Sequence, residues 1–193
     1  GSSIYFSGTT SSTTGIASAT DAYQSTYAGG TGGGGASDMF LAKFDTAGTR
    51  TWGTYYGGAG NDANAGGIAL DKWGNVIITG HTSSTSGIAT TINGPIQTTL
   101  GGFNDVLVAK FTPFDQRIWG SYFGNTGDDE GTGVLFTPSN GAMYLTGWTT
   151  SASGIAQGIS PYQGTFGGGT GGFSPGDAFV AKLNPDTMVF VKQ

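Results

Sequence analysis

Two short acidic segments contain the residues best suited to bind a metal ion. Gly57-Gly-Ala-Gly-Asn-Asp62 and Gly124-Asn-Thr-Gly-Asp-Asp129 take matched places, and the first resembles one turn of the Gly-Gly-x-Gly-x-Asp calcium repeat. Calcium takes six to eight oxygen ligands, so the candidate ligands are Asn61, Asp62, Asp128 and Asp129. The calcium-binding form of that repeat needs tandem copies, whereas these copies are 67 residues apart. A structural turn is therefore the preferred interpretation, and Ca²⁺ is the one cofactor considered.

Catalytic chemistry has little support in the sequence. The carboxylates of Asp128, Asp129 and Glu130 are consecutive, whereas glycoside hydrolysis needs an acid and a base on two sides of the sugar. His81 is the single histidine, and no cysteine or carboxylate lies close to it in the sequence. The chain has no cysteine, which excludes a thiolate nucleophile and a disulfide scaffold. We expect no enzymatic activity, and a hydrolase that uses the loop around Asp128 is the least favoured alternative.

Aromatic side chains indicate a different chemistry, the stacking of a ligand on a ring. Thr9, His81 and Trp148 occupy the same place in three related segments, directly after a glycine that closes a strand. Because this position varies between the segments, we expect it to be exposed and to contact a partner. The candidate ligand-binding residues are Trp148, His81, Tyr23 and Tyr162. They motivate a carbohydrate-binding, lectin-like alternative.

These residues are positioned by an internal repeat. The organising segment Asp38–Phe44 recurs as Asp105–Phe111 and as Asp177–Leu183, at spacings of 67 and 72 residues. From the strand-closing glycine to the next of these aspartates the distances are 30, 25 and 30 residues. All variation in length therefore falls in one connection, as expected for a loop between fixed elements.

Each repeat reads as four short strands. In the second copy they are Gly67–Leu70, Asn75–Thr79, Val106–Phe111 and Arg117–Phe123, rich in β-branched and aromatic residues and bounded by turn formers. No window has a convincing amphipathic helical pattern, so the chain is predicted to be all-β. The organising strand is apolar on both faces and is therefore expected to lie between two sheets. These features predict a β-propeller with four-stranded antiparallel blades, divided at 1–58 (first strand missing), 59–125 and 126–193 (last strand truncated).

The recurring charges and tryptophans are expected to form the scaffold. The aspartate and lysine of each organising strand lie on opposite faces and ~17 Å apart, so they cannot pair with each other. A partly buried charge needs a partner, and we expect each to meet a neighbouring blade. Trp52 and Trp119 are expected to pack between blades. The Ile of each Gly-Ile-Ala loop is expected to plug a blade edge, and the glycine runs that follow are interpreted as length padding.

Composition excludes several classes of function. The net charge is −5 and charged residues are 10% of the chain, which argues against a nucleic-acid surface built from clustered Lys and Arg. No apolar run approaches the ~20 residues of a membrane span. The aromatic content of 12% argues against disorder, despite 38 glycines.

The repeat resembles a known family. Gly-Asn-Val-Ile-Ile-Thr-Gly-His-Thr-Ser-Ser, then Pro-Ile-Gln-Thr-Thr-Leu-Gly-Gly, then Asn-Asp-Val-Leu-Val-Ala-Lys-Phe and Trp-Gly-Ser-Tyr-Phe-Gly are similar to the bacterial SBBP-type β-propeller repeat. The resemblance covers nearly the whole chain, and the third copy departs from it at Val191 and Lys192, where Trp-Gly is expected. It implies a secreted or cell-surface bacterial protein with an interaction role, and it transfers no catalytic residue.

The sequence thus predicts a non-enzymatic, adhesin-like propeller segment of an extracellular bacterial protein. The expected partner is a protein or a glycan at a cell surface. Because the chain begins and ends within a unit, it reads as an excerpt of a longer protein. Three blades do not close a ring of the usual 4–8, so more chain or another copy is expected to complete it.

Overall fold

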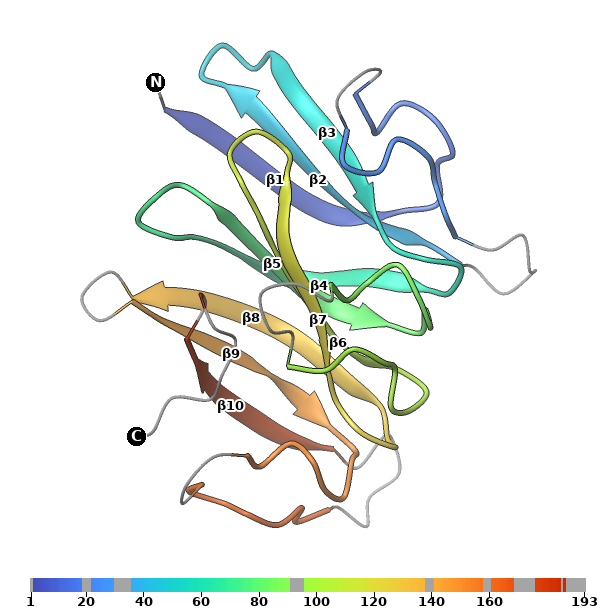
Figure 1. Ribbon diagram of the computed structural model, residues 1–193, viewed down its shortest axis with the longest axis vertical. Coiled ribbons are helices and arrows are strands. Elements are labelled where there is room, and N and C mark those ends of the chain that lie inside the picture. The colour runs from blue at the N-terminus through green and yellow to red at the C-terminus, as the bar shows by residue number, and fades with distance from the viewer. Residues whose placement is uncertain are drawn as a thin grey trace.

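The chain folds into antiparallel β-structure. The computed structural model describes residues 2–18, 22–29, 36–90, 96–137, 141–157, 161–168, 176–184 and 186. Within these residues it has ten strands in three sheets and no helix (Figure 1). The all-β prediction is confirmed. No helix in this part of the chain is long and apolar enough to cross a membrane.

The three sheets follow one another along the chain. The first has the order β1 (Ser3–Thr10), β2 (Asp38–Asp45), β3 (Arg50–Tyr56). The second has the order β4 (Asp62–Leu70), β5 (Val76–Thr82), β6 (Asp105–Phe111), β7 (Arg117–Phe123). The third contains β8 (Asp129–Thr137), β9 (Ala142–Thr149) and β10 (Asp177–Leu183), and β9 lies between the other two. A fourth strand expected at Val189–Gln193, with Val191 and Lys192, lies outside the described residues.

The bounds of β6 and β7 agree with the sequence to within one residue, whereas β5 ends at Thr82 instead of Thr79 and β4 begins early. β7 begins and ends as predicted, whereas β4 begins at Asp62 instead of Gly67. The additional residues are small or polar and have low β-propensity. They pair with β5 through a bulge between Asn64 and Gly67, where Gly66 adopts a φ of 105° that suits glycine. Tertiary pairing therefore extends the strand beyond its propensity.

The sheets stack face to face, and the core lies between them (Figure 1). One cluster joins Met39 and Leu41 of the first sheet to Ile78 of the second. The other joins Val108 and Trp119 of the second sheet to residues of the third. As predicted, β6 lies between two sheets, and all seven of its residues are buried. Trp119 packs between sheets, as expected from its sequence position.

The long connection that precedes each organising strand covers the outer edge of its own sheet. Tyr55 N donates to Gln24 O at 3.1 Å, and Tyr122 N donates to Gln97 O at 3.2 Å. These bonds pair an otherwise open edge strand, a common protection against aggregation. Ile88 of the Gly-Ile-Ala loop is completely buried, in agreement with the predicted plug.

Two glycines of the short run contradict the padding interpretation. A Cβ on Gly102 would lie 2.2 Å from Gly127 O, and one on Gly101 would lie 2.9 Å from Asn125 O. The connection therefore approaches the Gly124–Asp129 segment too closely for any side chain at these positions. Gly30 to Gly35 and Gly169 to Gly172 lie outside the described residues.

Candidate functional site

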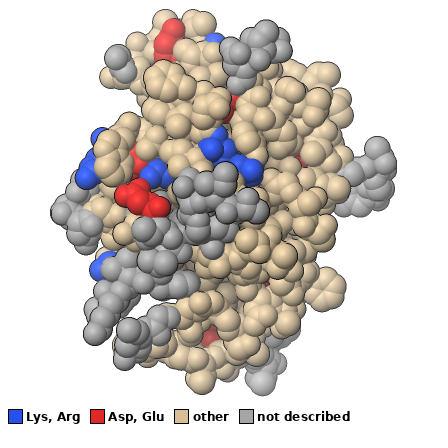
Figure 2. Space-filling view, viewed as in Figure 1, with Lys and Arg blue, Asp and Glu red and all other residues tan. Residues whose placement is uncertain are grey.

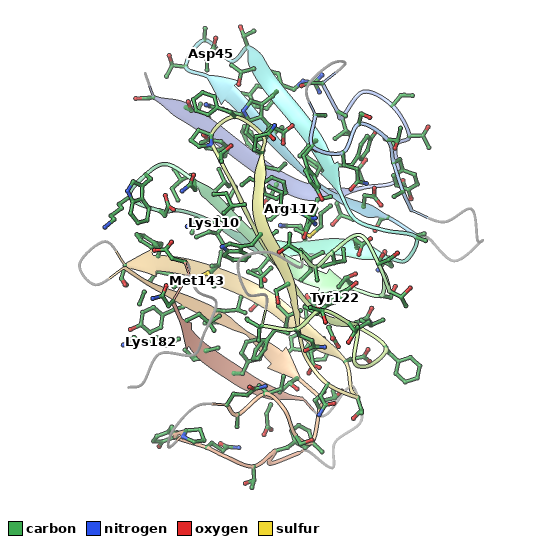
Figure 3. The ribbon with its side chains drawn as sticks, viewed as in Figure 1. Asp45, Lys110, Arg117, Tyr122, Met143 and Lys182 are labelled. Atoms are coloured by element: carbon green, nitrogen blue, oxygen red, sulfur yellow. The ribbon has the colours of Figure 1, made fainter. Side chains whose placement is uncertain are left out.

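The lysines of the organising strands connect successive sheets. Lys110 Nζ lies 3.0 Å from Asp71 Oδ2 and 3.3 Å from Asp186 Oδ1, which belongs to the third repeat (Figure 3 labels Lys110). Burial acts to raise the pKa of Asp71, but hydrogen bonds from Asn75 and Lys110 outweigh it and hold that pKa below its ordinary value. Lys43 Nζ donates to Pro113 O, in the second repeat, at 3.0 Å. Both lysines meet a neighbouring sheet, as predicted.

The aspartates of the organising strands anchor the long connections of their own repeats, so the expectation that they find their partners in a neighbouring blade was wrong. Asp105 Oδ2 accepts hydrogen bonds from Gln97 Nε2 at 2.7 Å and from Gly101 N at 2.9 Å. Asp38 Oδ2 accepts equivalent bonds at 2.9 Å from Gln24 Nε2 and Ala28 N. The third repeat has the same arrangement, in which Asp177 accepts from Gln163 and Gly167. The sequence signal was available, because Gln24, Gln97 and Gln163 recur with the aspartates, but it did not reveal the pairing.

The other oxygen of each buried aspartate faces a second carboxylate from the next repeat. Asp105 Oδ1 has no hydrogen-bond partner. A Cβ placed on Gly124 would lie 2.5 Å from Asp105 Oδ1 and 2.6 Å from Asp129 Oδ2. Because both oxygens lie this close to one point, the distance between them cannot exceed the sum of the two. Gly57 stands in the same way between Asp38 and Asp62, at 2.8 and 2.6 Å. Each boundary between sheets thus contains a glycine enclosed by two carboxylates.

Burial shifts the titration of these acids. Desolvation raises the pKa of Asp105 to about 6, and the charge of Asp129 adds to the shift. Desolvation raises the pKa of Asp38 to about 6 as well, with Asp62 as the neighbouring charge. Loop hydrogen bonds oppose the shift in both cases.

The proposed calcium ligands use their oxygens on protein donors. Asp129 Oδ2 accepts from Asn125 N at 2.9 Å and from Ser151 Oγ at 2.8 Å. Asp62 Oδ2 accepts from Gly58 N at 2.8 Å and from Ser84 Oγ at 2.7 Å. Asn61 Oδ1 accepts from Ser37 Oγ, and Asp128 Oδ1 accepts from Asn104 Nδ2. In the described part of the chain, no group of three or more His, Cys, Asp or Glu could hold a metal ion. This geometry favours structural turns, and calcium binding stays a prediction.

Two of the predicted ligand-binding residues lie near each other at the ends of strands. His81 is the penultimate residue of β5 in the second sheet, and its Nδ1 lies 3.5 Å from Oε2 of Glu130 in β8. Glu130 in turn faces Trp148 across the β8–β9 pair, where directly opposed side chains are in reach of each other. His81, Glu130 and Trp148 therefore form one group, the His81–Glu130–Trp148 cluster. Sequence reasoning considered Glu130 only as an acid beside Asp128 and Asp129, and it did not pair Glu130 with His81 because 49 positions separate them.

Hydrogen bonding from Asn61 indicates which ring nitrogen of a neutral His81 carries the proton. Ser37 Oγ donates to Asn61 Oδ1 at 2.6 Å, so the NH₂ group of the Asn61 amide points the other way. Its Nδ2 atom lies 3.4 Å from Nε2 of His81. Nε2 then accepts, and the neutral ring carries its proton on Nδ1, facing Glu130. The distance suits an ion pair, but the geometry is not that of a hydrogen bond. His81 and Glu130 are 21% and 25% exposed, so a ligand can reach both.

The two predicted tyrosines lie in different surroundings. Tyr23 packs edge-on against Phe111 at 5.6 Å, with the Arg117 guanidinium 4.7 Å above its ring. Its backbone N donates to Asp115 Oδ2 at 3.1 Å, so Tyr23 contributes to packing between the first and second repeats. Tyr162 is fully exposed.

Comparison with family models and with curated proteins returned no match. The resemblance to the SBBP-type repeat therefore stays a prediction, and the site is argued from its geometry alone.

Proposed function

We propose that this chain is a non-enzymatic interaction module of a bacterial extracellular or cell-surface protein, in which the three sheets are successive blades of a β-propeller. Face-to-face stacking of sequential antiparallel sheets with a shared repeat supports this arrangement. The resemblance of the repeat to the SBBP type supports the location.

One observation carries the interaction role: the charged residues that recur in every repeat are used inside the scaffold, whereas the residue after the strand glycine differs from repeat to repeat. Lys43 and Lys110 bind the neighbouring repeat, and Asp38 and Asp105 anchor loops. By contrast, the position after the strand glycine holds a different residue in each repeat and remains accessible. A scaffold that presents variable residues at strand ends is a common basis for recognition.

The His81–Glu130–Trp148 cluster favours a carbohydrate as the ligand. An indole ring offers an apolar surface on which a sugar ring can stack. A carboxylate, an imidazole and the nearby Asn61 amide supply donors and acceptors that can orient hydroxyl groups.

A glycan array followed by titration of tryptophan fluorescence tests the carbohydrate-binding proposal. We expect binding to at least one glycan class, and at least a tenfold loss of affinity in Trp148→Ala and in Glu130→Gln. Trp73→Ala is the matched control, because Trp73 is 57% exposed and its ring stacks on Lys72 away from the cluster. Equal loss of affinity in the control would contradict the site, and an array without any hit would remove the carbohydrate as ligand.

A pull-down with immobilised chain tests the wider interaction role. We expect capture of an extracellular protein or polysaccharide, with loss of capture in Trp148→Ala. Capture that survives both Trp148→Ala and Glu130→Gln would place the binding surface elsewhere on the molecule.

A further inference from the structure

Charged side chains of opposite sign gather at opposite ends of the sheets. Each organising strand begins with an aspartate and has its lysine near its other end. We call the end at which β2, β6 and β10 begin the loop end, since the long connections lead into it. The opposite end, where tight turns join β2 to β3, β4 to β5 and β6 to β7, is the turn end. Among the described residues, every lysine and arginine has its backbone at the turn end: Lys43, Arg50, Lys72, Lys110, Arg117 and Lys182.

The charged residues of the loop end are acids, apart from His81, in the part of the chain that the structure describes. Four of them are buried and three are partly exposed: Asp38, Asp62, Asp105 and Asp129, then Asp128, Glu130 and Asp177. The His81–Glu130–Trp148 cluster lies at this end, because β5 ends and β8 begins there. Figure 2 shows no Lys or Arg toward the right-hand edge of the face in view. The potential around the cluster is therefore negative, and it favours a cationic ligand over an anionic one.

The carboxylate of Glu130 is available to such a ligand. It accepts no hydrogen bond from the described residues, and its contact with His81 Nδ1 at 3.5 Å lacks hydrogen-bond geometry. The adjacent Asp129 differs, because its Oδ2 accepts from Asn125 N and from Ser151 Oγ. An ionised carboxylate can only accept, and its bonds to charged donors are stronger than its bonds to neutral ones. Because 25% of the Glu130 side chain is exposed, a donor can reach it from solvent.

We propose that the saccharide recognised by the His81–Glu130–Trp148 cluster carries a protonated amine, as an amino sugar without an N-acetyl group does. The inference rests on the proposed carbohydrate-binding function and names the chemical class of its ligand. The ammonium group donates to the Glu130 carboxylate, and the sugar ring stacks on Trp148. The positive charge also suits the indole, because cations are attracted to the face of an aromatic ring.

Other classes of ligand leave this arrangement unused. An acidic sugar brings a carboxylate, sulfate or phosphate group to an end where none of the described lysines and arginines starts. A neutral sugar can stack on Trp148, but it offers Glu130 only uncharged donors. A lysine-rich peptide satisfies the charge, but it has no ring to lie flat on the indole. The amino sugar alone uses both the aromatic surface and the carboxylate.

Titration with three oligosaccharides of equal length tests the charge preference. They are oligomers of glucosamine, N-acetylglucosamine and glucuronic acid, used at a pH at which the amine is protonated. We expect the glucosamine oligomer to bind at least tenfold more tightly than the N-acetylated one, as the strength of a charged hydrogen bond allows. The glucuronic acid oligomer should not bind. Added salt should weaken the binding of the glucosamine oligomer and leave that of the N-acetylated oligomer unchanged.

Substitutions connect the preference to Glu130. Glu130→Gln should bring the ratio between the affinities for the glucosamine and N-acetylated oligomers close to unity. Trp148→Ala should weaken both ligands and keep the ratio. Asp45→Asn is the matched control, because it removes the same charge from the turn end and should change neither affinity.

The outcomes separate this inference from the function on which it rests. Equal or tighter binding of the N-acetylated oligomer, or a preference for the amine that survives Glu130→Gln, would overturn the amino sugar and leave carbohydrate binding intact. A tetralysine peptide that binds as tightly as the glucosamine oligomer would overturn the assignment to a saccharide. A glycan array without any hit would overturn both the inference and the carbohydrate-binding function.

Discussion

Replacing Asp105 by asparagine is expected to stabilise the protein at neutral and alkaline pH. The side chain is fully buried, and one of its oxygens has no hydrogen-bond partner and faces Asp129 across Gly124. Asparagine keeps the shape and an acceptor for Gln97 and Gly101, and it removes the charge. Its NH₂ group then points at Asp129, where the carboxylate oxygen had been an unpaired acceptor.

The magnitude follows from the pKa of Asp105. Burial raises it from 3.8 to about 6, and each unit corresponds to about 1.4 kcal/mol. Ionising Asp105 in the folded protein therefore costs about 3 kcal/mol more free energy than ionising it in the unfolded chain. The folded protein holds this proton to a higher pH than the unfolded chain, so it binds more protons between about pH 4 and pH 6. Stability consequently falls as the pH rises through that window and is level above it.

Urea denaturation at several pH values between 4 and 8, followed by tryptophan fluorescence, measures the effect. The free energy of unfolding of Asp105→Asn should exceed that of the unaltered protein by up to about 3 kcal/mol at pH 8, and the two should converge near pH 4. The difference between the two proteins is the readout, because Asp38 gives both the same pH dependence. Asp45→Asn, in the 45–49 turn, is the matched control. A difference in unfolding free energy that is constant with pH, or an Asp105→Asn protein that is less stable at pH 8, would contradict a buried charge as the cause.

Three further substitutions test the scaffold. Gly124→Ala should lower the free energy of unfolding by about 1–3 kcal/mol, because its Cβ meets two carboxylate oxygens; Gly164→Ala, with its nearest neighbour at 3.6 Å, is the control. Arg117→Ala should cost about 1–3 kcal/mol, because its guanidinium binds two loop carbonyls at 3.1 and 2.9 Å and lies over two tyrosine rings. Arg50→Ala, which removes only exposed bonds to the equivalent loop, should cost less. Ile88→Ala should cost about 2–5 kcal/mol by thermal or urea denaturation, and a loss below 1 kcal/mol would show that the Gly-Ile-Ala loop is not a structural plug.

Local pattern was sufficient to predict the strands that are rich in β-branched and aromatic residues. Arg117–Phe123 forms as expected because its propensity, its partner strand and its burial agree. The start of β4 was missed because residues such as Gly66 carry no strand signal and depend on pairing with β5. The lysine contacts between repeats were also predictable, since a charge repeated in a buried strand needs a partner beyond its own strand.

The all-β class, the repeat and the scaffold role of the recurring lysines could be predicted from the sequence, because they depend on short periodicities and on equal spacing along the chain. Which side chains meet across sheets could not be predicted in this way. Asp105 faces Asp129, and His81 faces Glu130, because stacking brings strands of different repeats together. The physical reason is that a strand's own alternation specifies the face on which a side chain lies, whereas the identity of its neighbour depends on the register and stacking of another sheet.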